Sequence, residues 1–225
     1  MPSHPLDNPV WGALAGPQAE LGISSGRFRR LQDEIGLFAA VEDPAQGFEG
    51  LAEAIPSGMM QGLVAPHGVG VPTGMDVVEV ADVPQMVAAR LRPVGSLMPI
   101  RTLGPADVPA MLALTGLTHP GPFFVRTIET GYYAGIFEGD RLVAMTGERL
   151  RLPGYTEVSA VCTHPDFQGR GYAKALVSAI GQRIVDRGET PFLHVRAGNS
   201  AAIAAYEKLG FAIRQAMVFT VVRRR

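Results

Sequence analysis

The sequence predicts a folded protein of the α/β class, with helices layered against a sheet. Hydrophobic residues make up 47% of its 225 residues and charged residues 18%, a balance that excludes a mainly disordered chain. A chain of this length can bury about 70% of its unfolded surface, which allows a substantial core. From about residue 97 onward, strand-like and helical patterns alternate between turn residues, and this alternation indicates a layered sheet.

The charge and the cysteine count narrow the possible functions. The formal net charge is −1, so the chain has no basic field for binding nucleic acid. Cys162 is the only cysteine, which rules out an internal disulfide and a multi-cysteine metal site. The five histidines lack the spacing of a zinc hydrolase, so we expect no metal. Without a secretory signal or an apolar run of about 18 residues, the expected location is cytoplasmic, with no membrane partner.

Residues 1–96 have the less regular pattern. Asn8-Pro9 indicates a helix start, and the dense proline and glycine of 56–76 favour turns and short strands. Arg92-Pro93-Val94-Gly95 interrupts the pattern, so we predict two segments, 1–96 and 97–225. The elements expected in the first are a short helix at 9–14, a strand at 36–41, a helix at 44–55, a strand at 77–80 and a helix from Asp82 through Leu91.

Glycine and proline punctuate residues 97–225 regularly. Gly188 and Gly210 each follow a helical pattern, as glycine commonly does at helix ends. The expected order is a strand at 97–103, a helix opened by 104–107, a short helix reaching 130, a hairpin of 132–138 and 141–152, a strand at 155–163, a helix at 171–187, a strand at 192–196, a helix at 199–209 and a strand at 211–222.

The most informative stretch, 161–173, joins a strand to a helix through a loop with two glycines. Glycines let the backbone approach a ligand closely, and a helix N-terminus offers free N–H groups, which suits a phosphate or pyrophosphate. No G-x-x-x-x-G-K-[ST] string occurs, and Lys174 stands where a dinucleotide fingerprint needs glycine. Gln168-x-x-Gly171-x-Ala173 instead resembles the Q/R-x-x-G-x-G/A signature of the GNAT superfamily of acetyl-CoA-dependent N-acetyltransferases. An ordinary glycine-rich turn is the competing interpretation.

A second segment resembles the same family. Asn199, followed by Tyr206-Glu207-Lys208-Leu209-Gly210-Phe211, is similar to the family's N-x₆-Y-x-K-L-G-F segment. The element order of 97–225 is also similar to the whole GNAT fold, a mixed, mostly antiparallel sheet flanked by helices. Residues 1–96 then resemble the accessory half of a two-part subgroup, in which that half looks like a degenerate copy of the same fold.

The resemblance implies acetyl-CoA as the acyl donor and an amine as the acceptor. Backbone N–H groups of the loop would hold the cofactor, and its pantetheine arm would pair with the preceding strand. Asn199 has a competing role as a helix cap. The cofactor-binding residues implied are Val161, Cys162, Thr163, Gln168, Gly169, Arg170, Gly171, Tyr172, Ala173, Asn199 and Tyr206.

Two residues are candidates for the catalytic proton transfers. Tyr206 matches the tyrosine that protonates the departing thiolate in this family, and packing on the sheet is its competing interpretation. Glu157 is the candidate base, because strand alternation places it on the same face as Val161 and Thr163. Glu148, on the neighbouring strand, is the alternative base.

Three functions remain open at this point. Direct acetyl transfer to a primary amine of a small molecule or peptide is the leading one. A CoA-binding sensor without turnover and an acyltransferase using a longer acyl-CoA are the alternatives. Direct transfer needs no acyl-enzyme, so Cys162 is interpreted as a small buried hydrophobe despite the nearby His164. A homodimer is the oligomer considered, although no motif specifies it.

Overall fold

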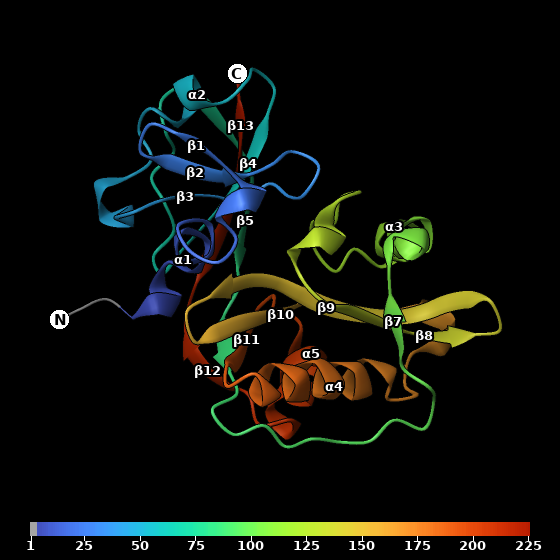
Figure 1. Ribbon diagram of the computed structural model, residues 1–225. Coiled ribbons are helices and arrows are strands. Elements are labelled where there is room, and N and C mark those ends of the chain that lie inside the picture. Colours follow the sequence, from blue (N-terminus) through green and yellow to red (C-terminus); the bar gives the residue numbers. More distant parts are fainter. Residues whose placement is uncertain (1–3) are drawn as a thin grey trace.

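The structure is a computed structural model that describes residues 4–225 (Figure 1). None of the helices in this range combines the length and apolar character needed to cross a bilayer. The α-helices are α1 (Pro9–Leu14), α2 (Leu51–Ala54), α3 (Val108–Thr118), α4 (Tyr172–Asp186) and α5 (Ser200–Lys208). The strands are β1 (Gly22–Ser25), β2 (Phe28–Leu31), β3 (Ala39–Val41), β4 (Met60–Ala65), β5 (Met75–Asp82), β6 (Gln85–Val87), β7 (Arg101–Leu103), β8 (Tyr133–Glu138), β9 (Arg141–Leu152), β10 (Tyr155–Thr163), β11 (Thr190–His194), β12 (Ala212–Gln215) and β13 (Val218–Arg224).

A seven-stranded sheet in the order β12-β6-β11-β10-β9-β8-β7 forms the largest layer. Within it β10 and β11 run parallel, and every other neighbouring pair is antiparallel. Helices α4 and α5 cover one face of the sheet, and α3 lies on the other (Figure 1). Leu176, Ile180 and Ile184 of α4 are fully buried, because residues four apart line one face of a helix. This mixed, mostly antiparallel sheet flanked by helices confirms the predicted fold class.

From residue 132 onward most predicted elements lie close to their predicted ends. Strands β8 and β9 form the hairpin, and β10 covers the whole strand expected at 155–163. Helices α4 and α5 differ from the prediction by one residue at each end. The strand predicted at 211–222 is instead two strands, β12 and β13, which belong to different sheets. Only the last three residues of the strand predicted at 97–103 pair, as β7.

The helix predicted at 44–55 is wrong for most of its length. Gly47 has φ +70° and Gly50 has φ +87°, and such left-handed residues interrupt a right-handed helix. What remains is a 3₁₀ turn at Pro44–Gln46 and the one-turn helix α2. The apolar residues at helical spacing, Phe48, Leu51, Ala52 and Ile55, are buried as expected, but they lie on a chain that bends between two short turns.

The helix predicted from Asp82 through Leu91 is also wrong. Asp82 ends β5, and β6 follows within three residues. Gln85 and Met86 are fully buried, with β11 pairing on one side and β12 on the other. Pairing with two strands therefore overrides the cap signal at Asp82.

Strand pairing crosses the predicted boundary at residue 96 in both directions. Strand β6, from the first segment, lies between β11 and β12. Strand β13, from the second segment, lies between β4 and β5, while β1, β2 and β3 form a third sheet. Two predictions are left untested by this pairing. One is the division into 1–96 and 97–225, and the other is the origin of the first half as a degenerate copy of the same fold. The structure shows that the two segments share two sheets.

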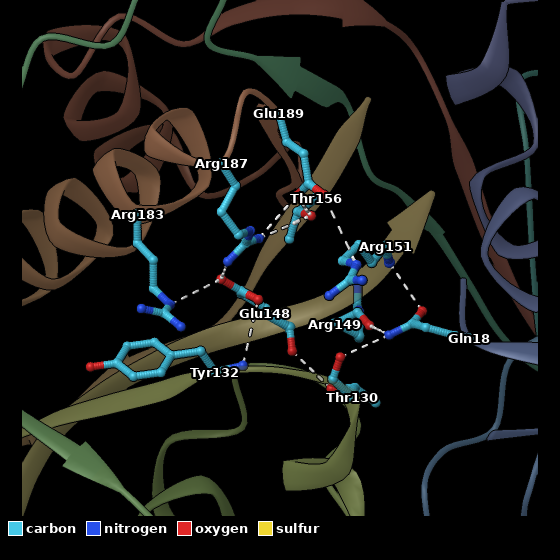
Figure 2. Close-up of polar contacts among 10 residues, drawn as sticks. All are labelled: Gln18, Thr130, Tyr132, Glu148, Arg149, Arg151, Thr156, Arg183, Arg187 and Glu189. Atoms are coloured by element: carbon cyan, nitrogen blue, oxygen red, sulfur yellow. Dashed lines mark hydrogen bonds and ion pairs between the residues drawn. The ribbon is translucent and has the colours of Figure 1, made fainter. Parts of the chain in front are cut away.

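Gln18 joins the first segment to the long strand β9 through three backbone groups. Beyond Gly147, the outer edge of β9 no longer pairs with β8. There the Nε2 of Gln18 donates to the carbonyls of Arg149 and Thr130, both at 2.8 Å, and its Oε1 accepts from the N–H of Arg151 at 3.0 Å (Figure 2). The side-chain amide thus takes the place of a peptide group on a neighbouring strand, and it is almost fully buried.

We expect Gln18→Ala to lower the free energy of unfolding by about 2–4 kcal/mol, because three shielded backbone groups would lose their partner. Denaturant titration measures this change. The control is Gln46→Ala, which removes an exposed glutamine and should change stability by less than about 0.5 kcal/mol. Equal effects of the two substitutions would contradict the bridging role of Gln18.

Candidate active site

The parallel strands β10 and β11 separate after three paired residues. Their pairing covers Tyr155 to Glu157 on β10 and Thr190 to Phe192 on β11. Beyond that point β10 bulges, and Ala160 has φ +53°, a conformation that residues with a side chain adopt infrequently. A cavity of about 330 Å³ is lined by residues of both separated strands. The splayed strands are therefore the place where a ligand can enter the sheet.

The bulge breaks the alternation predicted for β10. Strict alternation would place Glu157 and Val161 on one face. The pairing with β9 shifts between Ser159 and Cys162, so Val161 shares the α4 side with Val158 instead, while Cys162 packs on the α3 side. Val161, Cys162 and Thr163 all line the cavity. The Oγ1 of Thr163 is buried without a hydrogen-bond partner among the described residues. Because β11 does not pair with β10 beyond Glu157, this edge is open to a ligand that binds like an added strand.

The predicted phosphate loop follows β10 and leads into α4. Gly169 and Gly171 have φ +78° and +79°, and a Cβ at either position would meet no atom within 4 Å, so conformation rather than space requires glycine. Within residues 4–225, no protein acceptor bonds the backbone N–H groups of 169–174. These groups lie at the start of a 15-residue helix, which adds partial positive charge. The structure thus brings Gln168 to Ala173 together as an anion site.

Two side chains of the loop bind the protein rather than the open site. The hydroxyl of Tyr172 donates to Glu138 Oε1 at 2.7 Å, and Arg170 Nη1 lies 3.6 Å from the same oxygen. The guanidinium of Arg170 also lies 4.8 Å from the ring centre of Phe167. These contacts hold the loop in place, and its unbonded backbone N–H groups together with Gln168, which lines the cavity, face a ligand.

Tyr206 of helix α5 and Asn199, the residue just before that helix, line the same cavity. Burial raises the pKa of Tyr206 to about 12, so the phenol keeps its proton at neutral pH. Asn199 Oδ1 accepts a hydrogen bond from the N–H of Ala202 at 3.1 Å. Asn199 therefore caps α5, which is the competing role predicted from the sequence. A ligand role for Asn199 stays a prediction.

Glu157 lies behind the cavity wall instead of lining it. The residue is fully buried, and Arg149 Nε and Nη2 donate to its two oxygens at 2.8 and 2.7 Å. His194 Nδ1 lies 2.7 Å from Glu157 Oε1. Burial alone would raise the pKa of Glu157, but the Arg149 charge and the His194 hydrogen bond outweigh it and lower the pKa to about 2. Its role as the base stays a prediction, and it reaches the cavity only through Arg149 and His194.

Gln85 determines which nitrogen of His194 carries the proton. Gln85 Nε2 donates to the carbonyl of Leu6 at 2.9 Å, and its Oε1 accepts from Arg214 at 2.9 Å, so the orientation of the amide is fixed. The same Nε2 lies 3.2 Å from His194 Nε2, which must therefore accept. Hydrogen bonding assigns the proton to Nδ1, where it faces Glu157.

The position of Glu148, the alternative base, does not favour a catalytic role. It does not line the cavity and lies on the face of the sheet that α4 covers. Figure 2 shows the carboxylate beside Arg187, whose Nη1 donates at 2.7 Å, with Arg183 Nε 4.0 Å away. The geometry gives Glu148 a structural role in joining α4 to β9.

Several residues of the cavity wall were not predicted from the sequence. Phe38 and Val64 line it from the first segment, and the Arg149 guanidinium lies 4.6 Å from the ring centre of Phe38. The turn at Pro153-Gly154 alone would set Glu157 opposite Leu150, and Arg149 reaches Glu157 only because the register shifts between Thr156 and Val158. No sequence signal marks this irregularity or the N-terminal wall, which depends on long-range packing.

Cys162 behaves as predicted for a small buried residue. Its side chain is buried against α3, and burial raises the pKa of its thiol to about 11. The thiol is therefore protonated at neutral pH, which makes it a poor nucleophile.

Comparison with known proteins assigns the family. The FR47-like protein family matches residues 133–220. The chain is similar to a crystal structure described as a GNAT-family acetyltransferase of Novosphingobium aromaticivorans, at 41% identity and a TM-score of 0.91, covering 99% of this chain and 100% of that one. It is also 32% identical over 118 residues to the [ribosomal protein bS18]-alanine N-acetyltransferase of Salmonella typhimurium, covering 50% of this chain and 79% of that protein. This chain belongs to the GNAT family of acetyltransferases.

Other relatives match shorter stretches. The chain is 41% identical over 64 residues to a mycothiol acetyltransferase of Corynebacterium aurimucosum, which is 28% of this chain but only 21% of that protein. A GCN5-related N-acetyltransferase from Kribbella flavida shares the fold at a TM-score of 0.62 and 15% identity, over 96% of this chain and 93% of that one. Membership of the GNAT family confirms the resemblance and the N-acetyltransferase enzyme class predicted from the two motifs.

We expect Glu157→Gln to lower the free energy of unfolding by about 3–5 kcal/mol at pH 7, because Arg149 would keep a buried charge without its partner. The folded pKa of Glu157, about 2, lies below the ordinary value of 4.5. The carboxylate therefore stabilises the fold above pH 4.5, and this stabilisation is lost as the pH falls toward 2.

Denaturant titrations between pH 7 and pH 3 test this expectation. The difference between the unmodified protein and the variant should narrow over the acidic part of that range. Glu53→Gln serves as the control, because Glu53 is exposed and its substitution should have little effect. A pH-independent difference would count against the Glu157 ion pair as its source.

Proposed function

We propose that this enzyme transfers an acetyl group from acetyl-CoA to the primary amine of a small molecule or peptide. The observation that carries the proposal is the continuity of an anion-binding loop, Gln168 to Ala173, with the cavity between β10 and β11. The unbonded N–H groups of the loop suit the pyrophosphate, and the open edge of β10 suits the amides of pantetheine. The orphaned Thr163 Oγ1 offers a further partner on this path.

The reaction requires one bond to form and one to break. The amine nitrogen attacks the thioester carbonyl, a C–N bond forms, and the C–S bond breaks as the thiolate leaves. The amine loses one proton to solvent water, and the sulfur gains one from the enzyme. We assign the donor of the second proton to Tyr206, which lines the cavity with its hydroxyl protonated.

The high pKa of Tyr206 is compatible with this role. The burial that weakens the phenol as an acid also strengthens a thiolate as a base in the same cavity. Cys162 shows the direction of the effect on a thiol, since burial raises its pKa to about 11. Burial therefore raises the pKa of the proton donor and that of the accepting sulfur in the same direction.

We assign Glu157 an indirect part in removing the proton from the amine. Its carboxylate does not touch the cavity, so it acts by holding His194 and Arg149 at the wall. Residues 1–96 would serve as an accessory half that closes the acceptor side through Phe38 and Val64. The reaction draws on the cytoplasmic pool of acetyl-CoA, where we expect the protein to work, and a homodimer stays a prediction.

We expect Gly171→Asp to abolish CoA binding in calorimetry. The change introduces a negative charge at the anion site and a side chain where φ is +79°. Gly154→Asp is the matched control, because Gly154 also has φ +79° with open space around it but lies in the β9–β10 turn. CoA affinity should survive in the control. Unchanged CoA affinity in Gly171→Asp would show that the loop does not hold the cofactor.

We expect Tyr206→Phe to reduce kcat by about 10²–10⁴-fold with little change in CoA affinity, because only the hydroxyl is lost. Thiol release from acetyl-CoA, measured over a panel of amines, reports the rate. Tyr132→Phe is the control, since the Tyr132 hydroxyl contacts Thr102 away from the cavity. Because the pKa of Tyr206 is about 12, the activity of the unmodified enzyme should show no loss from this group up to pH 10. A fully active Tyr206→Phe variant would remove Tyr206 as the acid.

The same measurements separate the alternatives. Tight CoA binding without turnover on any amine would favour a sensor. Faster turnover with a longer acyl-CoA than with acetyl-CoA would favour the broader acyltransferase function.

A further inference from the structure

The formal charges that line the cavity are of one sign. Among residues 4–225, Arg149 and Arg196 line it, and no aspartate or glutamate does. Arg196 is largely exposed and pairs with Glu79 at 2.6 Å. Arg149 is different, because only 14% of its side chain is exposed and it sits where β10 and β11 begin to separate. A cationic acceptor would find no free carboxylate on this wall.

Arg149 has one nitrogen that no protein group uses. Its Nε and Nη2 bind Glu157, and the ring of Phe38 lies beside the guanidinium. Among residues 4–225, no acceptor bonds Nη1. The two bonds to Glu157 prevent rotation of the guanidinium, so the N–H groups of Nη1 have a fixed direction. A fixed, partly desolvated guanidinium is well suited to a carboxylate.

The ion pair with Glu157 explains how this arginine remains in place when the site is empty. Burial without a partner would be costly, and Glu157 supplies the compensating charge. His194 also donates to Glu157, so the negative charge of that carboxylate is shared between two donors. Arg149 therefore keeps hydrogen-bonding capacity for a second anion.

Apolar side chains lie directly beside Arg149. Phe38 packs against Phe219 with ring centres 5.7 Å apart, and both line the cavity together with Val64 and Val83. Three of these four residues come from the first segment. An acceptor held by Arg149 would therefore place its side chain against an apolar surface.

We propose that the acceptor is a small amine with a free carboxylate and an apolar side chain, an apolar α-amino acid, whose carboxylate binds Arg149 Nη1. Its side chain packs on Phe38 and Phe219. The carboxylate is not changed in the reaction, and it holds the neighbouring amine in the cavity. This assignment rests on the proposed acetyl transfer and adds the class of acceptor. A peptide N-terminus lacks a carboxylate next to its amine and would leave Nη1 without a partner.

Leucine and leucinamide test the proposal, because they share the amine and side chain and differ in the carboxylate. We expect kcat/KM for leucine to exceed that for leucinamide by at least about tenfold. The amine of the amide is less basic, so chemistry alone would favour leucinamide. Equal or faster turnover of leucinamide would overturn the assignment and leave acetyl transfer standing.

The variant Arg149→Gln/Glu157→Gln removes both charges together and leaves no unpaired ion. It should reduce the preference for leucine to about twofold or less while CoA affinity remains unchanged. Arg196→Gln removes the other cavity arginine and should keep the preference. If Arg196→Gln lost the preference for leucine and the Arg149/Glu157 double variant kept it, the carboxylate would bind Arg196 instead of Arg149.

Calorimetry distinguishes failure of this inference from failure of the proposed function. N-acetyl-leucine and N-acetyl-leucinamide are titrated into the protein with and without CoA. Tighter binding of the acid, lost in the double variant, supports the Arg149 site even if no amine is acetylated. Equal binding overturns it. Absence of CoA binding and of all turnover overturns the proposed function, whereas the two titrations still decide the role of Arg149.

Discussion

The site depends on the separation of two neighbouring strands that begin as a pair. Strands β10 and β11 share three residue positions, and the bulge at Ala160 then turns β10 away while its pairing with β9 resumes at Cys162. A left-handed residue with a side chain costs on the order of 1 kcal/mol, and the continued pairing with β9 offsets that cost. The cavity, the open strand edge and the position of the anion-binding loop all follow from this separation.

Where the strands part, two opposing effects act on Glu157. Burial disfavours its charge, while two donors from Arg149 and one from His194 favour it more strongly. The opposite balance applies to Tyr206 and Cys162, which have no cationic partner and keep their protons. One cavity thus has a permanent ion pair at its base, and Tyr206 and Cys162 on its walls remain neutral.

The sequence was informative where function depends on local backbone geometry. The loop at Gln168–Ala173 and the cap at Asn199 could be predicted because glycine and asparagine act within a few residues of themselves. Prediction failed where distant strands determine the structure. Residues 85–87 are strand because β11 and β12 pair with them, and Glu157 lies behind the wall because Arg149 and His194 lie in front. The alternation rule also failed at Ala160, since a bulge leaves no simple pattern in the sequence.

The exchange of strands across residue 96 has a consequence for how the chain can fold during synthesis. Strand β13 is translated after all the other strands described, yet it occupies the centre of the sheet that also contains β4 and β5. Strand β6 likewise has both neighbours far downstream. The first segment emerges from the ribosome with unpaired strand edges and must wait for more than a hundred further residues. A nascent chain that stalls before β13 therefore exposes a sheet without its middle strand, a state that molecular chaperones would have to protect.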